Sequence, residues 1–318
     1  MSTILKKSKI RWQLISTVFA LLLLSTGYLP LFLPDNPPPV HTVGPYNVHF
    51  IDIGQGDAIL IDYGEFEILV DAGDNLTANR NYLINYLKQY VDGPLEYVVA
   101  THPHADHIGG MGDVFRNFTV GEFWHTADPY YNDTATGRNL LIQVDNLGVP
   151  KYDARIGDCI SFEGLTLTVV SSYDPKYDVN GRSIVFLLEG DGVSMLLTGD
   201  AERPAELNYI QYLYSGIDIL KLGHHGSRNG SSNELLDYIQ PSLAIYTSKT
   251  GNSYGHPHIE AIKRLQDRSI PYFGTDVNGS IVIKVEAGTY TVVCQKSPSL
   301  NDFGLLVVRY HALPRNFM

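Results

Sequence analysis

The sequence predicts an α+β fold in which two β-sheets pack face to face and helices cover their outer faces. Two successive β-rich halves follow one another along the chain, and helical segments are interspersed among the strands of each half. Of the 318 residues, 44% are hydrophobic and 18% are charged, which is ordinary for a globular protein with a sizeable core. The chain is therefore long enough for one large domain of this kind.

Short apolar runs bounded by glycines and acidic residues predict the strands of the first half. We expect these strands at 48–53, 58–62, 67–70, 97–100 and 120–125, with a tight turn at Gly54-Gln-Gly56. Helical spacing of apolar residues predicts helices at 81–91 and 138–147. The glycines at 109, 110 and 112 predict a loose connection after the fourth strand.

The second half repeats this pattern. Strands are expected at 165–170, 183–188, 193–198, 217–222 and 243–247, and helices at 202–214, 233–239 and 257–267. Pro257 stands at the start of the last helix, a position that proline tolerates. Strands at 281–285 and 290–293 close the sheet, and 303–310 is a candidate final strand.

The first 33 residues predict a targeting segment that is either a signal peptide or a signal-anchor. Its positive start holds Lys6, Lys7, Lys9 and Arg11, and the apolar run at 14–33 is long enough to span a bilayer about 30 Å thick. Because no A-x-A cleavage site is evident, the anchor is favoured over cleavage. Both readings place the rest of the chain on the extracellular side of the cell membrane, either anchored or secreted. A Pro-rich linker at 34–42, a folded domain at 43–296 and a C-terminal extension at 297–318 are expected to follow.

Charge and cysteine content narrow the function only mildly. The formal net charge of −11 gives no global basic field for nucleic acid, although a local basic patch remains compatible with it. Cys159 and Cys294 both lie in strand-like stretches, and they are consistent with a disulfide or with two isolated buried thiols.

The stretch Thr101-His-Pro-His-Ala-Asp-His-Ile-Gly-Gly110 carries the strongest chemical signal, because four of its residues are common metal ligands. In extended chain, positions two apart point the same way, so His102 and His104 can converge on one cation. Asp106 and His107 follow where the chain leaves the strand, and they can face a second cation. Imidazole and carboxylate ligands suit zinc and are acceptable to manganese or iron. The alternative is a set of surface histidines in a loop, which accounts poorly for this spacing.

Three further places can complete such a site. Asp200 follows an apolar strand and a glycine, where it can bridge two cations or cap the next helix. His224 and His225 end another strand beside glycines, as ligands or as a solvent-facing pair. His256 precedes a helix, where it can meet a substrate phosphate or simply cap that helix.

These motifs make the chain resemble the metallo-β-lactamase superfamily, and most closely its ComEC-like branch, the hydrolase domain of competence proteins. The matching pieces run in order through residues 46–285: Phe50-Ile-Asp-Ile-Gly-Gln-Gly-Asp-Ala58, Leu69-Val-Asp-Ala-Gly73, the His102–His107 stretch, Leu197-Thr-Gly-Asp200, Lys221-Leu-Gly-His-His-Gly-Ser227 and Tyr254-Gly-His-Pro-His258. The resemblance implies a four-layer αββα sandwich with the metal site at one edge of the two sheets.

The resemblance also implies roles for these residues. His102 and His104 would hold one metal, Asp106 and His107 the other, and Asp200 would bridge them. Either His224 or His225 would complete the second metal. Asp71 would orient a ligand histidine through a hydrogen bond, and Asp57 would do similar work. The implied cofactor is Zn²⁺, as one or two ions, with Mn²⁺ as an alternative.

One departure from the family concerns the metal at His102 and His104. Many members carry another metal-binding histidine between the cluster and the bridging aspartate. Here His125 is the only histidine in that interval, and it lies ahead of the expected place. The equivalent region, 180–183, has no imidazole, so we expect this metal to depend heavily on Asp200.

Taken together, the motifs predict metal-assisted hydrolysis. Asp106 or Asp200 would orient the nucleophile, and His256 would stabilise the developing anion or protonate the leaving oxygen. The resemblance implies a phosphodiester substrate, with single-stranded DNA at the cell surface as the leading candidate. The alternatives are a cell-surface phosphodiesterase acting on wall or lipid head groups, a lactamase-type hydrolase, and a non-catalytic module that binds DNA or a partner. The acidic charge favours a small or neutral substrate over a long polyanion.

Overall fold

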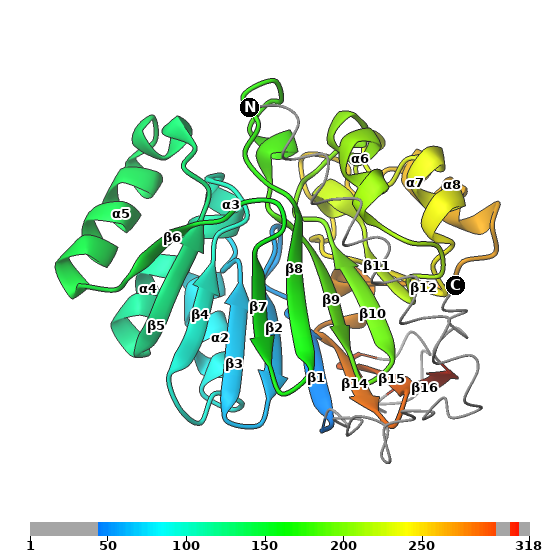
Figure 1. The fold of residues 1–318 in the computed structure, drawn as a ribbon, viewed down its shortest axis with the longest axis horizontal. Helices are drawn as coiled ribbons and strands as arrows, with labels where there is room; N and C mark the ends of the chain where they lie inside the picture. The colour runs from blue at the N-terminus through cyan, green and yellow to red at the C-terminus, as the bar shows by residue number, and fades with distance from the viewer. Residues whose placement is uncertain (1–43, 297–305, 312–318) are drawn as a thin grey trace, which may run out of the picture. The chain divides into compact units, whose positions relative to one another are not determined.

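The computed structural model describes residues 44–296 and 306–311, and two mixed β-sheets stacked face to face dominate them (Figure 1). The first sheet contains, in spatial order, β16 (Leu306–His311), β15 (Thr289–Cys294), β14 (Ile281–Glu286), β1 (Tyr46–Phe50), β2 (Ile59–Tyr63), β3 (Phe66–Val70), β4 (Leu95–Val99), β5 (Val120–His125) and β6 (Lys151–Asp153). Strands β3 to β6 run parallel, and the other pairs in this sheet are antiparallel.

The second sheet has the same mixture of strand directions. It contains β13 (Tyr272–Gly274), β12 (Leu243–Tyr246), β11 (Ile219–Lys221), β10 (Val193–Leu197), β9 (Val185–Gly190), β8 (Leu165–Ser171) and β7 (Cys159–Phe162). Strands β10 to β13 are parallel, whereas β7 to β10 form antiparallel hairpins. Each sheet therefore has one parallel half. The loops that follow the carboxyl ends of the parallel strands lie in the same region in both sheets.

Helices cover the outer face of each sheet and complete four layers. In the first half these are α2 (Thr77–Leu87), α3 (Ala105–Ile108), α4 (Met111–Asn117) and α5 (Ala135–Leu147); in the second they are α6 (Arg203–Tyr209), α7 (Asn233–Ile239) and α8 (Ile259–Gln266). One apolar core lies between the sheets, and one lies beneath the helices on each side. Each fully buried large apolar side chain in these layers contributes roughly 1.5–3 kcal/mol. The predicted αββα sandwich is confirmed.

The C-terminal strands return to the first sheet. Strand β14 pairs with β1, so Ile281 lies opposite Phe50. The sequence analysis placed the strand at 281–285 in the second β-rich half, so a division into two successive sheets would put it in the second sheet. The observed pairing with β1 shows that this division is wrong for the C-terminal strands. The candidate final strand is present as β16, which pairs with β15.

The glycines after the histidine cluster do not form the predicted loose connection. The chain enters α3 at Ala105 and α4 at Met111 with only two residues between the helices. A Cβ atom on Gly110 would lie 2.1 Å from the carbonyl oxygen of Ala72, and one on Gly109 would lie 2.4 Å from the backbone of Asp74. These glycines therefore allow the loop after β3 to press against the helices that carry the cluster.

Other differences are small but bear on the site. Helix α2 begins at Thr77 and ends at Leu87, ahead of the predicted 81–91. Helix α8 begins at Ile259, so His258 is its N-cap residue and His256 does not cap it. Strands β6 and β13, each of three residues, were not predicted, because so short a run carries little periodicity.

Cys159 and Cys294 are both free, so the disulfide alternative is wrong. They lie in different sheets, in β7 and β15. Cys294 is buried as predicted, but Cys159 is exposed because it faces outward on an edge strand.

The predicted targeting segment and linker lie outside the described residues. Among the helices that the structure does describe, none is both long and apolar enough to cross a membrane.

Glu67 in the first sheet is a buried carboxyl group close to other acidic side chains. Glu67 of β3 lies directly opposite Asp62 of β2, and its side chain is fully buried with neither oxygen in a hydrogen bond. Burial, together with the nearby Glu96, Asp92 and Asp62, raises the pKa of Glu67 to about 8. Like charges opposite one another on a sheet are destabilising, so this carboxyl group favours its protonated form.

We predict that Glu67→Gln stabilises the fold in a pH-dependent way. Between pH 4.5, the ordinary Glu value, and about 8, the folded state holds a proton that the unfolded state has lost, so stability falls as pH rises. The gain from Glu67→Gln should therefore grow with pH in this window, by up to about 1.4 kcal/mol per pH unit. Urea unfolding of chelator-treated protein at pH 5 and pH 8 measures it, with the exposed Glu65→Gln as the control. A gain that is the same at both pH values would contradict the assignment.

Candidate metal centre

Each candidate ligand lies just beyond the carboxyl end of a parallel strand. Asp71 follows β3, His102 to His107 follow β4, Asp200 follows β10, and the His224–His225 pair follows β11. Because carboxyl ends of parallel strands meet at one edge of a sheet, the two parallel halves bring these loops together. The predicted position at one edge of the two sheets therefore follows from the strand order.

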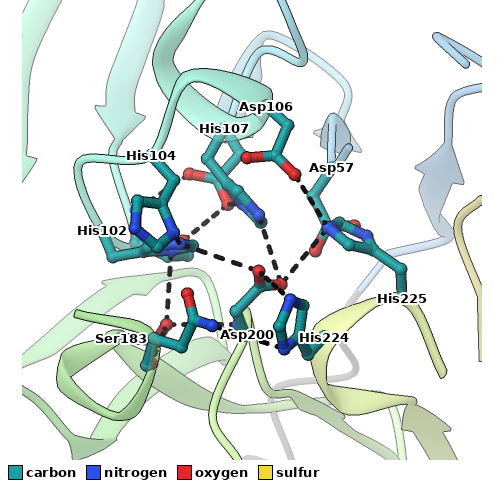
Figure 2. Close-up of polar contacts among 12 residues, drawn as sticks. Asp57, His102, His104, Asp106, His107, Ser183, Asp200, His224 and His225 are labelled. Carbon is teal, nitrogen blue, oxygen red and sulfur yellow. Dashed lines mark hydrogen bonds and ion pairs between the residues drawn. The ribbon is translucent and has the colours of Figure 1, made fainter. Parts of the chain in front are cut away.

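Asp200 lies at the centre of the cluster, as Figure 2 shows. Its side chain is fully buried. Its Oδ1 atom lies 3.2 Å from Nε2 of His107 and 3.5 Å from Nε2 of His225. Its Oδ2 atom lies 3.7 Å from Nε2 of His102 and 3.6 Å from Nε2 of His224. Asp200 does not cap the next helix, because Glu202 is the N-cap residue of α6.

Two groups of ligand-type atoms share this carboxylate. Asp106, His107, Asp200 and His225 form one group, and His102, His104 and Asp200 form the other, with the ligand atoms of each group within 4.8 Å of one another. Both Asp200 oxygens and the Nε2 atoms of His107 and His225 are buried without a hydrogen-bond partner. Buried polar atoms are rarely left unpaired, so this donor set fits cations placed on either side of Asp200. The cluster is consistent with a binuclear metal site.

Asp71 orients His107 from behind. Its Oδ2 atom lies 2.7 Å from Nδ1 of His107 and accepts a hydrogen bond from the Thr101 hydroxyl, and its Oδ1 atom accepts one from the Thr101 backbone N–H. A carboxylate on Nδ1 fixes the imidazole tautomer and turns Nε2 toward Asp200. Asp71 adopts a left-handed backbone (φ 60°), a conformation that costs energy outside glycine and is held here by these contacts.

Asp57 orients His225 in the same manner. Its carboxylate lies 3.3 Å from Nδ1 of His225 and 2.9 Å from Nζ of Lys221, and it accepts a hydrogen bond from the Thr247 hydroxyl. Burial opposes ionisation, but Lys221 and His225 hold the pKa of Asp57 well below its usual range. Lys221 is fully buried, so Asp57 and Lys221 form a buried ion pair beneath the site.

The His224–His225 pair divides between two surroundings. His225 is 1% exposed and lies 3.4 Å from Asp106, so the structure groups His225, and not His224, with Asp106 and His107. His224 is partly exposed at the cavity wall, with Nδ1 2.8 Å from Glu202. A solvent-facing pair is therefore wrong for His225.

The charges of the histidines follow their partners. Burial opposes protonation of all of them, but Asp200 and Asp71 raise the pKa of His107 well above its ordinary value. Asp200, Asp106 and Asp57 raise the pKa of His225 to about 9. Burial and the neighbouring His107 lower the pKa of His102 instead. Bound cations would take the place of these protons on the imidazoles.

The cluster opens into a cavity of about 680 Å³. His104, Asp106 and His224 line it on the metal-ligand side, and Tyr130, Tyr254 and His256 line it elsewhere. The ring of His256 lies 5.1 Å from that of His224 and stacks on Tyr254 at 5.8 Å. Its Nδ1 atom is buried without a partner.

Some site residues escaped the sequence analysis. Glu202 carries no motif beyond its place two residues after Asp200, yet it contacts His224. Ser183 lies 3.3 Å from Nδ1 of His102 and accepts a hydrogen bond from the backbone of Asp200. Lys221 belongs to a quoted motif, but its buried pairing with Asp57 needed the fold to show it.

A family model described as the metallo-beta-lactamase superfamily matches residues 51–246. ComE operon protein 3 of Bacillus subtilis is 28% identical over 266 residues, which cover 77% of this chain and 34% of that protein. Competence protein ComA of Neisseria gonorrhoeae is 28% identical over 269 residues, covering 83% of this chain and 35% of that protein. Recombination protein 2 of Haemophilus influenzae is 28% identical over 242 residues, covering 74% and 28%. The chain thus spans about a third of the length of these curated relatives.

Solved structures show the same fold at low identity. A metallo hydrolase from the archaeon Ignicoccus hospitalis superposes with a TM-score of 0.51 at 17% identity, covering 76% of this chain and 100% of that chain. CmlA, a diiron beta-hydroxylase from Streptomyces venezuelae, gives a TM-score of 0.51 at 13% identity, covering 79% and 55%. At this identity the likeness concerns the fold alone.

We predict that Lys221→Met destabilises the protein by about 3–5 kcal/mol, because it leaves the buried Asp57 carboxylate without its cation. Urea unfolding at neutral pH with chelator present measures this loss. The double variant Asp57→Asn/Lys221→Met removes both charges and should lose clearly less. Equal losses for the single and double variants would contradict a stabilising role for the charge pairing.

Proposed function

The chain belongs to the metallo-beta-lactamase superfamily and is distantly related to the ComEC-type competence proteins, and from this premise we propose that it is a metal-dependent phosphodiesterase that cleaves DNA. Its place of action in this proposal is the extracellular side of the cell membrane. The observation that carries the proposal is the buried Asp200 carboxylate, shared by two groups of histidine and aspartate ligands at the floor of an open cavity.

The metal requirement follows from the donor set. Imidazole and carboxylate ligands around a shared carboxylate are typical of two-metal hydrolases. We propose Zn²⁺ as the resident ion, with Mn²⁺ as the alternative. When bound, such ions lower the pKa of water toward neutrality and neutralise charge on the phosphate under attack.

The protein's own residues would then position the reactants. Asp106 is partly exposed at the cavity floor, where its carboxylate can accept a hydrogen bond from the attacking water. His256 faces the cavity beside His224 and can donate an N–H hydrogen bond to the leaving oxygen. Burial, with His224 and His225 nearby, lowers the pKa of His256 to about 4, so the ring is neutral near pH 7. The neutral ring favours hydrogen-bond donation over proton transfer from an imidazolium.

A second hollow of about 510 Å³ supports a polymeric substrate. It shares Glu202 and Asn229 with the first cavity, and Arg203, Arg228 and Arg264 line it. Arg228 pairs with Glu260 at 3.3 Å, and both side chains are about half exposed. An exposed pair of this kind contributes little, so a phosphate can displace the glutamate at small cost. Glu202 and Glu234 line the same hollow, and Arg203 is paired with Glu234. With three arginines and two glutamates, its lining is nevertheless less acidic than the net charge of −11 suggests.

The relatives favour DNA over other phosphodiesters. One of them is named for competence and one for recombination, processes in which DNA is handled. The chain spans about a third of those proteins, so their whole activity is not carried over. A cell-surface phosphodiesterase acting on wall or lipid head groups would use the same metal site, and substrate comparison separates the two.

We predict that the full chain loaded with Zn²⁺ or Mn²⁺ hydrolyses bis-p-nitrophenyl phosphate and cleaves single-stranded DNA faster than phosphocholine esters. His104→Ala should lower both phosphodiesterase rates by about 100-fold or more, because loss of a supporting group alone typically costs 10–100-fold. His125→Gln, which changes a histidine outside the cluster, is the control. A loaded protein without phosphodiesterase activity, or an unchanged rate in His104→Ala, would refute the catalytic proposal. Faster hydrolysis of phosphocholine esters than of single-stranded DNA would identify head-group phosphodiesters, and not DNA, as the substrate class.

A further inference from the structure

The metal group of His102 and His104 is short of a ligand. It holds two imidazoles and the shared Asp200, whereas the other group holds Asp106, two imidazoles and Asp200. Asn180, in the short helical turn before β9, carries no imidazole that could fill the place. The side chain of Asn180 nevertheless lies beside the site, with Nδ2 3.4 Å from Nδ1 of His224. The imidazole that lies next to Asn180 therefore belongs to His224.

The four histidines nearest Asp200 divide into two pairs, one facing each carboxylate oxygen. His107 and His225 both face Oδ1, whereas His102 and His224 both face Oδ2. A bridging carboxylate offers one oxygen to each metal. Ligands placed tetrahedrally about 2.1 Å from zinc are separated by about 3.4 Å, close to the 3.6 and 3.7 Å that separate Oδ2 from these two imidazoles.

His224 has a carboxylate on Nδ1, as His107 and His225 do. His107 has Asp71 on Nδ1, and His225 has Asp57 on Nδ1, and each turns Nε2 toward Asp200. His224 has Glu202 on Nδ1 at 2.8 Å and Nε2 toward Asp200. The Glu202 carboxylate is itself held by the Ser227 hydroxyl at 2.9 Å. An imidazole with a carboxylate on one nitrogen and the other nitrogen free is the usual arrangement of a metal ligand.

The backbone supports the same conclusion. His224 and His225 both adopt left-handed conformations, with φ of 48° and 55°. Positive φ is uncommon outside glycine, although histidine adopts it more readily than most residues, and two such residues in succession are held by their surroundings. The effect here is that consecutive side chains reach opposite oxygens of one carboxylate.

From these contacts we infer that His224 is the third imidazole ligand of the metal held by His102 and His104, and that Glu202 positions it. The ligand comes from the loop after β11 in place of the loop that holds Asn180. This inference rests on the metal dependence of the proposed function and is independent of its substrate. The resemblance left open whether His224 or His225 completes the second metal, whereas this inference assigns His224 to the first.

Metal content of the full chain tests it. After loading with Zn²⁺ and dialysis, elemental analysis should find two ions per wild-type chain and one per His224→Ala chain. In a zinc titration, Glu202→Gln should keep both sites but weaken one by about 10-fold. His256→Ala, which removes a neighbouring cavity histidine that has no carboxylate partner, should keep two ions at unchanged affinity.

Rescue separates ligation from folding. The double variant Asn180→His/His224→Ala restores an imidazole to the same corner from the other loop, and it should bind two ions again. Circular dichroism confirms that each variant is folded before its metal content is compared. With Mn²⁺, the electron paramagnetic resonance spectrum should change from a coupled pair in the wild type to an isolated ion in His224→Ala, and the pair should return in the double variant.

Two outcomes overturn the inference. The first is a folded His224→Ala chain that keeps both ions at wild-type affinity. The second is a wild-type chain that binds one ion whose affinity His224→Ala leaves unchanged. Absence of phosphodiesterase activity with the predicted metal pattern intact would refute the proposed function and leave this inference standing.

Discussion

The fully buried carboxylate of Asp200 is the constraint on which the site depends. A buried carboxylate needs positive charge or hydrogen-bond donors on both oxygens, and the protein offers four imidazole nitrogens at 3.2–3.7 Å, two for each oxygen. None of these satisfies an Asp200 oxygen by a hydrogen bond. The arrangement is therefore stable when cations are bound, or when protons on the imidazoles take their place. The raised pKa values of His107 and His225 describe the protonated state without cations.

The supporting contacts extend this charge pattern outward. Asp71, Asp57 and Glu202 each hold one histidine by Nδ1, and Lys221 balances Asp57 from beneath. Alternating charges of this kind keep each imidazole in one tautomer and one orientation. The two sheets supply the rigid frame, because every one of these groups follows or ends a strand or lies in a short loop beside it.

The sequence was informative where chemistry or periodicity is local. The His102–His107 spacing and the glycine before Asp200 predicted which residues meet, and alternating apolar runs predicted the sandwich. Non-local facts were not predictable in this way. The pairing of β14 with β1 depends on residues more than 200 positions apart, and the glycines at 109 and 110 look flexible until Ala72 and Asp74 are packed against them. The different partners of His224 and His225 depend on Glu202, Asp57 and Asp106, which no spacing rule connects.

The central claim is that two cations share Asp200, and anomalous X-ray diffraction from crystals of the Zn²⁺-loaded chain tests it most directly. The account predicts two anomalous peaks on opposite sides of Asp200, about 3.5–4 Å apart, one facing each carboxylate oxygen. No peak, or a single peak that both Asp200 oxygens contact, would contradict it.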